Sequence, residues 1–446
     1  MTMRNILKSP WLRLIVFLIL CAATIFTFNR LLVPINEGAF YLFYELSQRD
    51  DVDLAIVGSS VVHSDFNPHI ISEITGLETY TISIGHMDMP GSLAATKHMY
   101  RSNKPKYVCL VVEPDTFNLS QEHRQTQQIL LSCINDPRIT IPYYLDLCSQ
   151  DGLYFDRLFV YRSFMSNPLQ NLRNAVSIHL DPEGYFDQAE IGKSGRYKGR
   201  GYYRDPQEGA GLDVLRFMPL RPTQDIALQP GISPYFTQKL TQYKTLCEKN
   251  GSQLIVVMAP NMLANALAKE GYVEKQLELA DLCAQMDIPY FNFYFAKEEF
   301  LPRLDQYYRD ILHLDYRGTD IFSEKFAEFL RDYLAGEETD HLFYHTAEEF
   351  LSSIHCITNA WIDEKTGSEQ DVYTAGCLHG ASVTPEYSFH LVASDGTLTL
   401  LQPYSASNTY ACASGELAGK RLRVYAKPVG SDEPSQIFFD IICRAQ

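Results

Sequence analysis

The sequence has no excess of basic residues. It contains 38 Lys and Arg against 54 Asp and Glu, which gives a formal net charge of −16. Nucleic acids and anionic membrane surfaces bind proteins through clustered cations that replace counterions. The composition therefore argues against a nucleic-acid partner, and against an anionic membrane surface as the partner of the whole molecule.

The cysteines lack the spacing of a metal site, and the one histidine pair with such a spacing, His341 and His345, lacks a third ligand. None of the 10 cysteines forms a Cys-x-x-Cys pair. Several occur in apolar runs, such as Cys109 in YVCLVV, where a thiol packs as a small hydrophobe. His341 and His345 have no evident third ligand, so we expect a surface helix there. A glycine-rich phosphate loop is also missing. The sequence thus implies no metal and no cofactor.

One long uncharged apolar run is present, at the N-terminus. Residues 14–28 carry no charge and follow Arg4, Lys8 and Arg13. With its flanks the run approaches the ~20 residues that span a bilayer. We expect a retained membrane anchor whose basic residues stay cytoplasmic, so that the bulk of the chain is extracytoplasmic. A cleaved signal peptide is the alternative, because its apolar region has the same composition.

The rest of the chain divides into an α/β part and a β part. Five short apolar runs separated by helical stretches predict strands buried on both faces of a parallel sheet. They are DVDLAIVGSS, ETYTISIG, PKYVCLVVEP, GSQLIVVMAP and DIPYFNFY. We expect the N-terminus and anchor in residues 1–35 and a flavodoxin-like, three-layer α/β domain in residues 36–338. A small all-β, sandwich-like domain is expected in residues 339–446, with a hairpin at Asp395-Gly396.

Helix ends can be read from capping residues. Asn67 is a plausible N-cap with Pro68 at the first helical position, and Gly76 is a stop signal. Residues 234–251 and 318–336 predict two further helices, one before the fourth strand and one closing the α/β domain.

Residues 116–235 are too long for one connection between strands. We interpret them as an insertion that covers or borders the strand ends. Within it, GKSGRYKGRGYYR places five Lys or Arg and three Tyr in 13 residues. This segment fits a solvated surface loop, which we favour, or a site that holds an anionic or sugar-like polymer by charge and ring stacking.

Polar residues that could perform catalysis follow the first strand and precede the last helix. Active sites of open parallel sheets lie at the carboxyl ends of the strands, where Gly58 allows a sharp turn before Ser59 and Ser60. Asp310 and His313 are three residues apart, so the carboxylate can fix the imidazole tautomer. A serine with such a pair supplies the groups for nucleophilic acyl transfer. A Gly-x-Ser-x-Gly elbow is absent, which disfavours an α/β-hydrolase.

At these residues the chain resembles the SGNH (GDSL-like) hydrolases. Their first block carries the nucleophile in a Gly-Asp-Ser segment, and their last block is Asp-x-x-His. VGSSVVHSDFNP is similar to the first block, which makes Ser60 the nucleophile and puts Ser59 where the family has Asp. DILHLDYRGTDIFSEKFAEFL is similar to the closing block, so the resemblance covers roughly residues 50–335.

Within that superfamily the layout is more similar to membrane-anchored envelope proteins. These belong to the D-alanyl-lipoteichoic-acid transfer and alginate O-acetylation type, with a Gly-Ser-Ser block after one N-terminal anchor. Such proteins often partner a membrane-bound O-acyltransferase. The resemblance therefore implies that partner and an envelope polysaccharide.

The oxyanion donors follow the family pattern only in part. Its second block offers a glycine amide, for which SIGHMDMPG supplies Gly85. Its third block offers an Asn side chain, whereas VVEPDTFN has Glu113 and Asp115 there, whose carboxylates would repel a developing oxyanion. We expect the amides of Ser60 and Gly85 as donors, with Asn118 as a further one. Substrate contacts are expected from Ser59, His63, His86, Glu113 and Asp115.

These features predict a membrane-anchored extracytoplasmic serine esterase or O-acyltransferase. Its substrates are expected to be acyl esters, with acetyl as the expected group, of a cell-envelope polysaccharide, and Ser60 would carry the acyl intermediate. The altered third block motivates an alternative: a non-catalytic scaffold of the same fold, or a glycan-binding partner of a membrane-bound O-acyltransferase.

Overall fold

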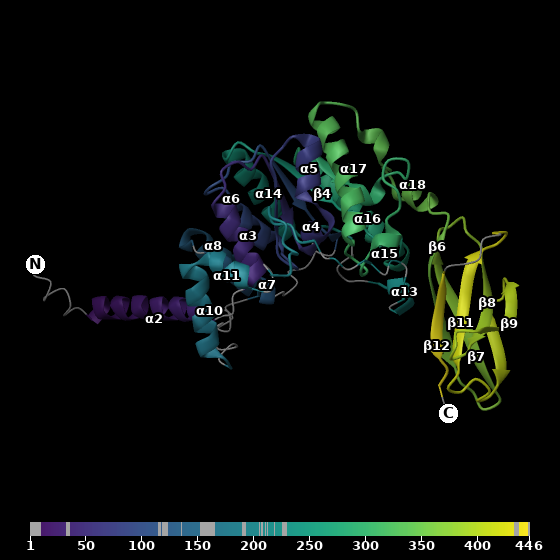
Figure 1. The fold of residues 1–446 in the computed structure, drawn as a ribbon. Coiled ribbons are helices and arrows are strands. Elements are labelled where there is room, and N and C mark those ends of the chain that lie inside the picture. Colours follow the sequence, from purple (N-terminus) through teal and green to yellow (C-terminus); the bar gives the residue numbers. More distant parts are fainter. Residues whose placement is uncertain are drawn as a thin grey trace, which may run out of the picture.

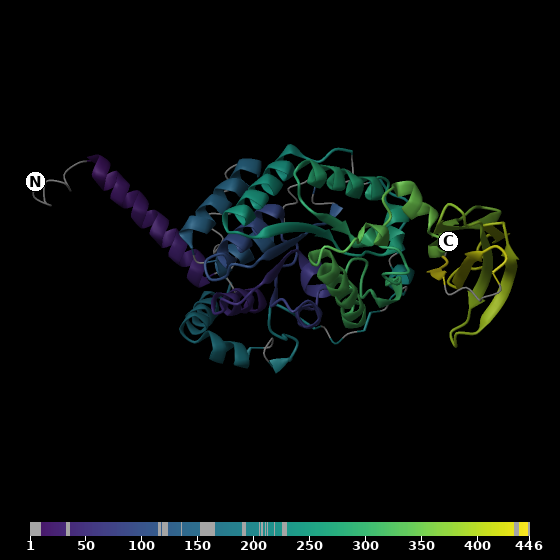
Figure 2. The ribbon, with the colours of Figure 1, turned by 90° about the horizontal axis from the view of Figure 1, so that it is seen from above.

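The computed structural model describes most of the chain. The described residues are 10–32, 36–114, 117, 124–134, 136–151, 166–189, 193–204, 206, 208–209, 211, 213–217, 219–224, 230–431 and 437–444. Figures 1 and 2 show an α/β unit from which one long helix projects, with a β unit at the opposite end.

The five apolar runs form a parallel sheet, as predicted. Its strands are β1 (Leu54–Gly58), β2 (Thr79–Ser83), β3 (Tyr107–Val111), β4 (Gln253–Met258) and β5 (Tyr290–Asn292). All neighbouring strands pair in parallel, in the order β2-β1-β3-β4-β5. This is the order of flavodoxin-like sheets, in which ligands bind beyond the carboxyl ends of the strands near β1 and β3.

Helices cover both faces of this sheet and produce three layers (Figure 1). Ala55 and Val57 pack into one core, and Leu54 and Ile56 pack into the other. The first core also receives residues of α3 (Glu37–Ser47), α6 (Met89–Met99), α14 (Pro234–Lys249) and α16 (Tyr272–Gln285). The second receives residues of α4 (Ser60–Asp65), α5 (Pro68–Thr75), α15 (Leu263–Ala268) and α17 (Tyr316–Leu334).

The helix ends confirm the capping analysis. The Asn67 side chain accepts a hydrogen bond from the His69 amide, Pro68 is the first residue of α5, and Gly76 ends the helix with φ of 70°. The two later helices that were predicted correspond to α14 and α17.

The described part of the segment between β3 and α14 is mainly helical and packs on the first core. Its helices are α7 (Arg124–Cys133), α8 (Pro137–Asp151), α10 (Pro168–Leu180), α11 (Pro182–Gln188) and α13 (Asp213–Phe217). Leu130 of α7 and Tyr143 of α8 are buried beside α3 and α6. This segment also reaches the strand ends, because Thr126 Oγ1 donates a hydrogen bond to the Gly85 carbonyl at 2.5 Å.

The basic stretch within this segment is not simply a solvated loop. Residues 193–204 run along the β2 edge, where the Thr81 amide donates to the Arg200 carbonyl at 3.0 Å. Arg200 forms an ion pair with Glu78 at 2.9 Å, and Tyr202 is only 2% exposed. The expectation of a surface loop is wrong for these residues, because the open edge of β2 needs hydrogen-bond and apolar partners. Lys193, Arg196 and Lys198 remain exposed.

The C-terminal strands form two antiparallel sheets with a shared core. The strands are β6 (Ile357–Lys365), β7 (Gln370–His379), β8 (Pro385–Val392), β9 (Leu398–Ser405), β10 (Thr409–Ala413), β11 (Arg421–Pro428) and β12 (Phe438–Ile442). Their orders are β10-β7-β6 and β12-β11-β8-β9. Ile362 and Tyr373 of the first sheet share a core with Phe389 and Val424 of the second. The predicted hairpin joins β8 to β9, with Gly396 at φ of 86°.

Two short helical elements, η6 (Asp340–Leu342) and α18 (Ala347–Ser352), lie between α17 and β6 and connect the two units. Two others, η4 (Phe293–Phe295) and η5 (Asp305–Tyr307), lie between β5 and α17 within the α/β unit. Phe343 and Phe350 are buried against the α/β unit, so this connection packs on that unit before β6 begins.

The projecting helix, α2 (Pro10–Leu32), contains the N-terminal apolar run. Its residues Pro10–Asn29 have a mean hydropathy of 2.3, and that part lies outside the protein core. The helix is long and apolar enough to cross a membrane, a property that a signal sequence shares.

Candidate functional site

The first half of the site is the turn from β1 into α4. Gly58 ends β1 where a Cβ atom would lie 2.8 Å from both the Val111 carbonyl oxygen and the Val62 side chain. Close approach to β3 therefore requires glycine here, whereas its φ is not in the left-handed region. Ser59 is the N-cap of α4, and its Oγ accepts from the Val61 amide at 3.4 Å. Ser60 thus opens the helix at the carboxyl end of β1.

The second half is the loop before α17. Tyr308 and Leu314 form an antiparallel bridge, and the Arg309 amide donates to the His313 carbonyl at 2.9 Å. Inside this hairpin, Asp310 Oδ1 accepts from the amides of Leu312 and His313, each at 2.9 Å. The side chains of Asp310 and His313 are therefore brought together by a tight loop, not by a helical turn.

The two halves meet in a continuous chain of hydrogen bonds. His313 Nε2 lies 2.7 Å from Ser60 Oγ, and His313 Nδ1 lies 2.9 Å from both carboxylate oxygens of Asp310. Because a carboxylate only accepts, Nδ1 carries the proton and Nε2 accepts the one from Ser60. The structure thus brings together the three residues predicted from the sequence, although Ser60 and His313 are more than 250 positions apart in the chain.

The pKa of Asp310 keeps its side chain ionised. Burial raises this pKa, but the hydrogen bonds and the charge of His313, with those two amides, outweigh burial and lower it to about 2. An ionised Asp310 stabilises the imidazolium that forms when His313 takes a proton.

Glu113, at the end of β3, contacts the neighbouring serine. Ser59 Oγ donates to Glu113 Oε2 at 2.5 Å, and Ser59 is 7% exposed. The Glu113 carboxylate is therefore held on Ser59, and the Ser59 hydroxyl links β3 to the first turn of α4. Asp115 and Asn118, the other two residues expected after β3, lie outside the described residues.

Gly85 lies beyond the end of β2, which is the neighbour of β1 on the side opposite to β3. Gly58 and Ser83 are paired at the carboxyl ends of β1 and β2. Residues 60 and 85 each follow one of these paired residues by two positions, so both lie beyond the same ends of the strands. Within the described part of the chain, the amides of Ser60 and Gly85 donate no hydrogen bond to another group. Two such amides can receive an oxyanion. His86 is exposed and has φ of 58°, an uncommon conformation for a residue with a side chain.

His63 follows Ser60 by one turn of α4 and is held neutral. Burial lowers its pKa to about 3, helped by the charges of His313 and Arg309. Its ring meets that of Tyr203 edge to face, with 6.3 Å between centroids. His63 therefore adds no positive charge beside His313 at neutral pH.

Two residues that position the site had no signal in the sequence. Arg309 lies between the halves: its Nη2 donates to Ser64 Oγ at 2.9 Å, and its Nε is 3.8 Å from Asp310 Oδ2. Asp65 is fully buried and accepts from the Leu314 amide at 3.1 Å. Burial raises the pKa of Asp65 well above its usual range despite that bond. The contacts of Arg309 and Asp65 fix the Asp310 loop against α4. The residues on either side of these contacts are far apart in the sequence and meet only in the folded chain.

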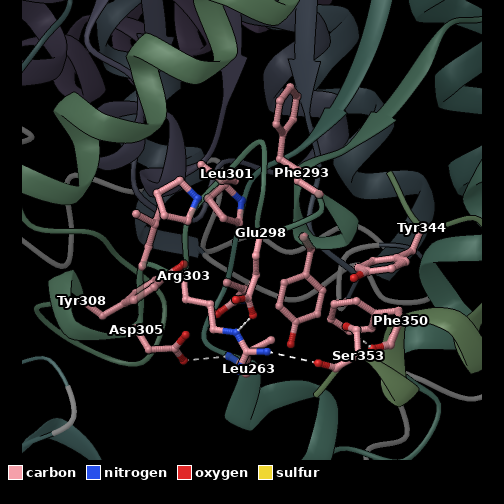
Figure 3. Close-up of a pocket in the computed structure, with 16 residues that line it drawn as sticks. Leu263, Phe293, Glu298, Leu301, Arg303, Asp305, Tyr308, Tyr344, Phe350 and Ser353 are labelled. Atoms are coloured by element: carbon pink, nitrogen blue, oxygen red, sulfur yellow. Dashed lines mark hydrogen bonds and ion pairs between the residues drawn. The ribbon is translucent and has the colours of Figure 1, made fainter. Parts of the chain in front are cut away.

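A cavity of about 50 Å³ lies near β5 and is shown in Figure 3. Its charged groups have partners: Arg303 contacts Glu298 and the Ser353 carbonyl, and Asp305 accepts from the Leu263 amide at 3.0 Å. These contacts join the α/β unit to α18, which indicates a structural joint.

The described residues contain no group of three His, Cys, Asp or Glu able to hold a metal ion. His341 lies in η6 and His345 in the loop after it, so the surface helix expected for this pair is not formed. No protein-family model matches the chain, and no curated protein matches it.

Proposed function

We propose that this protein is a serine esterase or O-acyltransferase of SGNH type. The observation that carries the proposal is the Ser60–His313–Asp310 hydrogen-bond chain at the carboxyl edge of the parallel sheet. Its geometry fits the distances at which a nucleophile and a general base exchange a proton. The position beyond β1 and the strand order agree with the resemblance seen in the sequence.

The reaction has two acyl-transfer steps. Ser60 Oγ attacks the ester carbonyl while His313 Nε2 takes its proton, and the amides of Ser60 and Gly85 receive the oxyanion. The intermediate collapses as His313 returns the proton to the leaving oxygen, which leaves an acyl-serine. Water or a sugar hydroxyl then gives its proton to His313 and attacks the acyl-serine. As the C–O bond to Ser60 breaks, His313 returns that proton to Ser60 Oγ, which regenerates the enzyme. Water as acceptor yields an esterase, and a hydroxyl of a polysaccharide yields an O-acyltransferase.

The position of Glu113 supports catalysis over a scaffold role. The carboxylate that stands in the family's third block accepts a hydrogen bond from Ser59, so part of its charge is directed away from Ser60. The repulsion anticipated from the sequence is correspondingly weaker. We therefore rank the enzyme above the non-catalytic scaffold.

We also propose that α2 is retained as a membrane anchor, with the α/β and β units extracytoplasmic. The surface around the base of α2 supports retention of the anchor. Asn171 of α10 donates to the Leu32 carbonyl at 2.9 Å, and α10 lies across the end of α2 (Figure 1). Leu169 and Leu180 of α10 are 81% and 80% exposed. Exposed apolar residues beside a spanning helix fit contact with the membrane interface.

Anchoring favours a substrate at the same surface. A tethered enzyme meets envelope polysaccharides at high effective concentration. We propose an acylated envelope polysaccharide as substrate, with acetyl as the acyl group. We also propose a membrane-bound O-acyltransferase as the partner protein.

Acyl release from p-nitrophenyl acetate by the full chain in detergent tests the enzyme. The parent should release p-nitrophenol, and Ser60→Ala and His313→Ala should each lose at least about 10³-fold while remaining folded. Equal rates for the parent and both variants would contradict the proposal.

A further inference from the structure

A basic cavity lies near the active-site rim of this acidic protein. Its volume is about 380 Å³, and three cations line it together with the Tyr316 ring. These cations are Arg196, Lys198 and Arg204, all from the basic stretch 193–204. The Arg204 guanidinium lies 4.7 Å from the centroid of Tyr316. The cavity therefore combines positive charge with an aromatic face.

Two of the three cations pair with no carboxylate of the described residues. Arg204 forms an ion pair with Asp320 at 3.2 Å, and nearby Glu208 pairs with Arg317 at 3.3 Å. Arg196 and Lys198 are exposed, and among the residues the structure describes neither side chain has a carboxylate partner. In a chain with a net charge of −16, such a local surplus attracts anions.

The backbone holds these cations in a fixed arrangement. Gly199, Arg200 and Gly201 have φ of 82°, 57° and 75°, which folds the stretch back on itself. The hydrogen bond from Thr81 secures it to β2, and the Lys198 carbonyl lies 2.9 Å from His69 Nε2. A rigid site loses little conformational entropy when a ligand binds.

The same stretch leads to the catalytic residues. Tyr203, next to Arg204, is the ring that packs edge to face on His63, and His63 follows Ser60 by one turn of α4. Tyr316, which also lines the cavity, follows His313 by three residues. The segments that line the cavity therefore lie next to α4 and to the loop that carries His313.

We propose that this cavity binds an anionic group, a carboxylate or a phosphate, carried by the carbohydrate or polyol chain on which Ser60 acts. The inference rests on the proposed function for the identity of that chain, whereas binding of the anion rests on the cavity alone. Arg196 and Lys198 contact the anion, and the Tyr316 ring packs against the neighbouring unit of the chain.

The test measures binding by the full chain in detergent with three matched probes: an oligogalacturonate, a glycerol-phosphate oligomer and a neutral galactose oligomer. Arg196→Gln/Lys198→Gln is the test variant, and Lys193→Gln is its control because Lys193 is exposed on the same stretch but outside the cavity. One anionic probe should bind better than the neutral one, and added salt should weaken it. The test variant should weaken this binding roughly fivefold to twentyfold, and the control should not.

The two anionic probes distinguish a carboxylate from a phosphate ligand. Equal binding of neutral and anionic probes, no binding of either anion, or equal affinity of the parent and the test variant would each overturn the proposal. Hydrolysis of p-nitrophenyl acetate, a neutral ester, should be the same in the test variant and the parent. If the parent binds an anion but hydrolyses nothing, the proposed function fails while the anion site stands.

Discussion

Replacing Asp310 with Asn should remove most of the activity while the protein stays folded. With the amide oxygen in the position of Oδ1, it can still accept from the amides of Leu312 and His313, and the amide nitrogen then takes the position of Oδ2, 2.9 Å from His313 Nδ1. That nitrogen donates, so the imidazole proton moves to Nε2. His313 would then donate a hydrogen bond to Ser60 instead of accepting its proton. A triad trapped in this tautomer loses about 10⁴-fold in kcat.

The cost to stability should be small by comparison. The pKa of Asp310 falls from 3.8 to about 2 on folding. At about 1.4 kcal/mol for each pH unit this would amount to about 2.5 kcal/mol for a fully buried group. Its side chain is 47% exposed, so we discount the contribution to about 1 kcal/mol. This contribution is present above pH 4 and is lost as the pH falls through 2.

The assay compares hydrolysis of p-nitrophenyl acetate with unfolding in urea for the parent, Asp310→Asn and Asp332→Asn. Asp332 is the matched control, because its side chain is 45% exposed and lies near the far end of α17. The control should retain activity and stability. An active Asp310→Asn variant, or one that loses activity only by unfolding, would refute the role given to Asp310.

Three further outcomes are expected. The depressed pKa of His63 means that the unfolded chain binds one more proton between pH 3 and 6.5, so native stability falls as the pH drops through that range. His63→Gln should remove up to about 1.4 kcal/mol per pH unit of this slope in urea titrations, whereas the exposed control His341→Gln should leave it unchanged. Gly58→Ala should destabilise the protein by about 1–3 kcal/mol in the same assay and reduce hydrolysis, because its methyl group would press on β3. The full-length chain should stay in the membrane pellet after alkaline carbonate extraction, whereas recovery as a shortened soluble protein would indicate a cleaved signal peptide.

Much of the fold could be predicted because its signals are local. Continuous apolar runs correspond to strands buried on both faces, and Asn67, Pro68 and Gly76 mark the ends of a helix by their own backbone preferences. The order of the strands also placed Ser60 and the Asp310 loop at one sheet edge. Their approach to within hydrogen-bond distance required only that topology and short loops.

Other features depend on contacts that no local pattern encodes. Tyr202 of the basic stretch is buried and Tyr197 and Tyr203 are half-buried because β2 has an open edge, and edge position is a property of the assembled sheet. The hydrogen bond that Glu113 accepts could not be predicted from the sequence, because the donor, Ser59, lies 54 residues away. Arg309 and Asp65 belong to ordinary polar stretches, and their positioning roles emerge only when α4 packs against α17.

The most direct test of the central claim is covalent labelling of the full chain with a fluorophosphonate, followed by mass spectrometry of the labelled peptide. An activated serine displaces fluoride and retains the phosphonyl group, whereas an ordinary serine does not react. We predict a single adduct on Ser60, still formed in Ser59→Ala and lost in His313→Ala and Ser60→Ala. A folded parent that takes no label, or that takes it on a serine other than Ser60, would contradict the account.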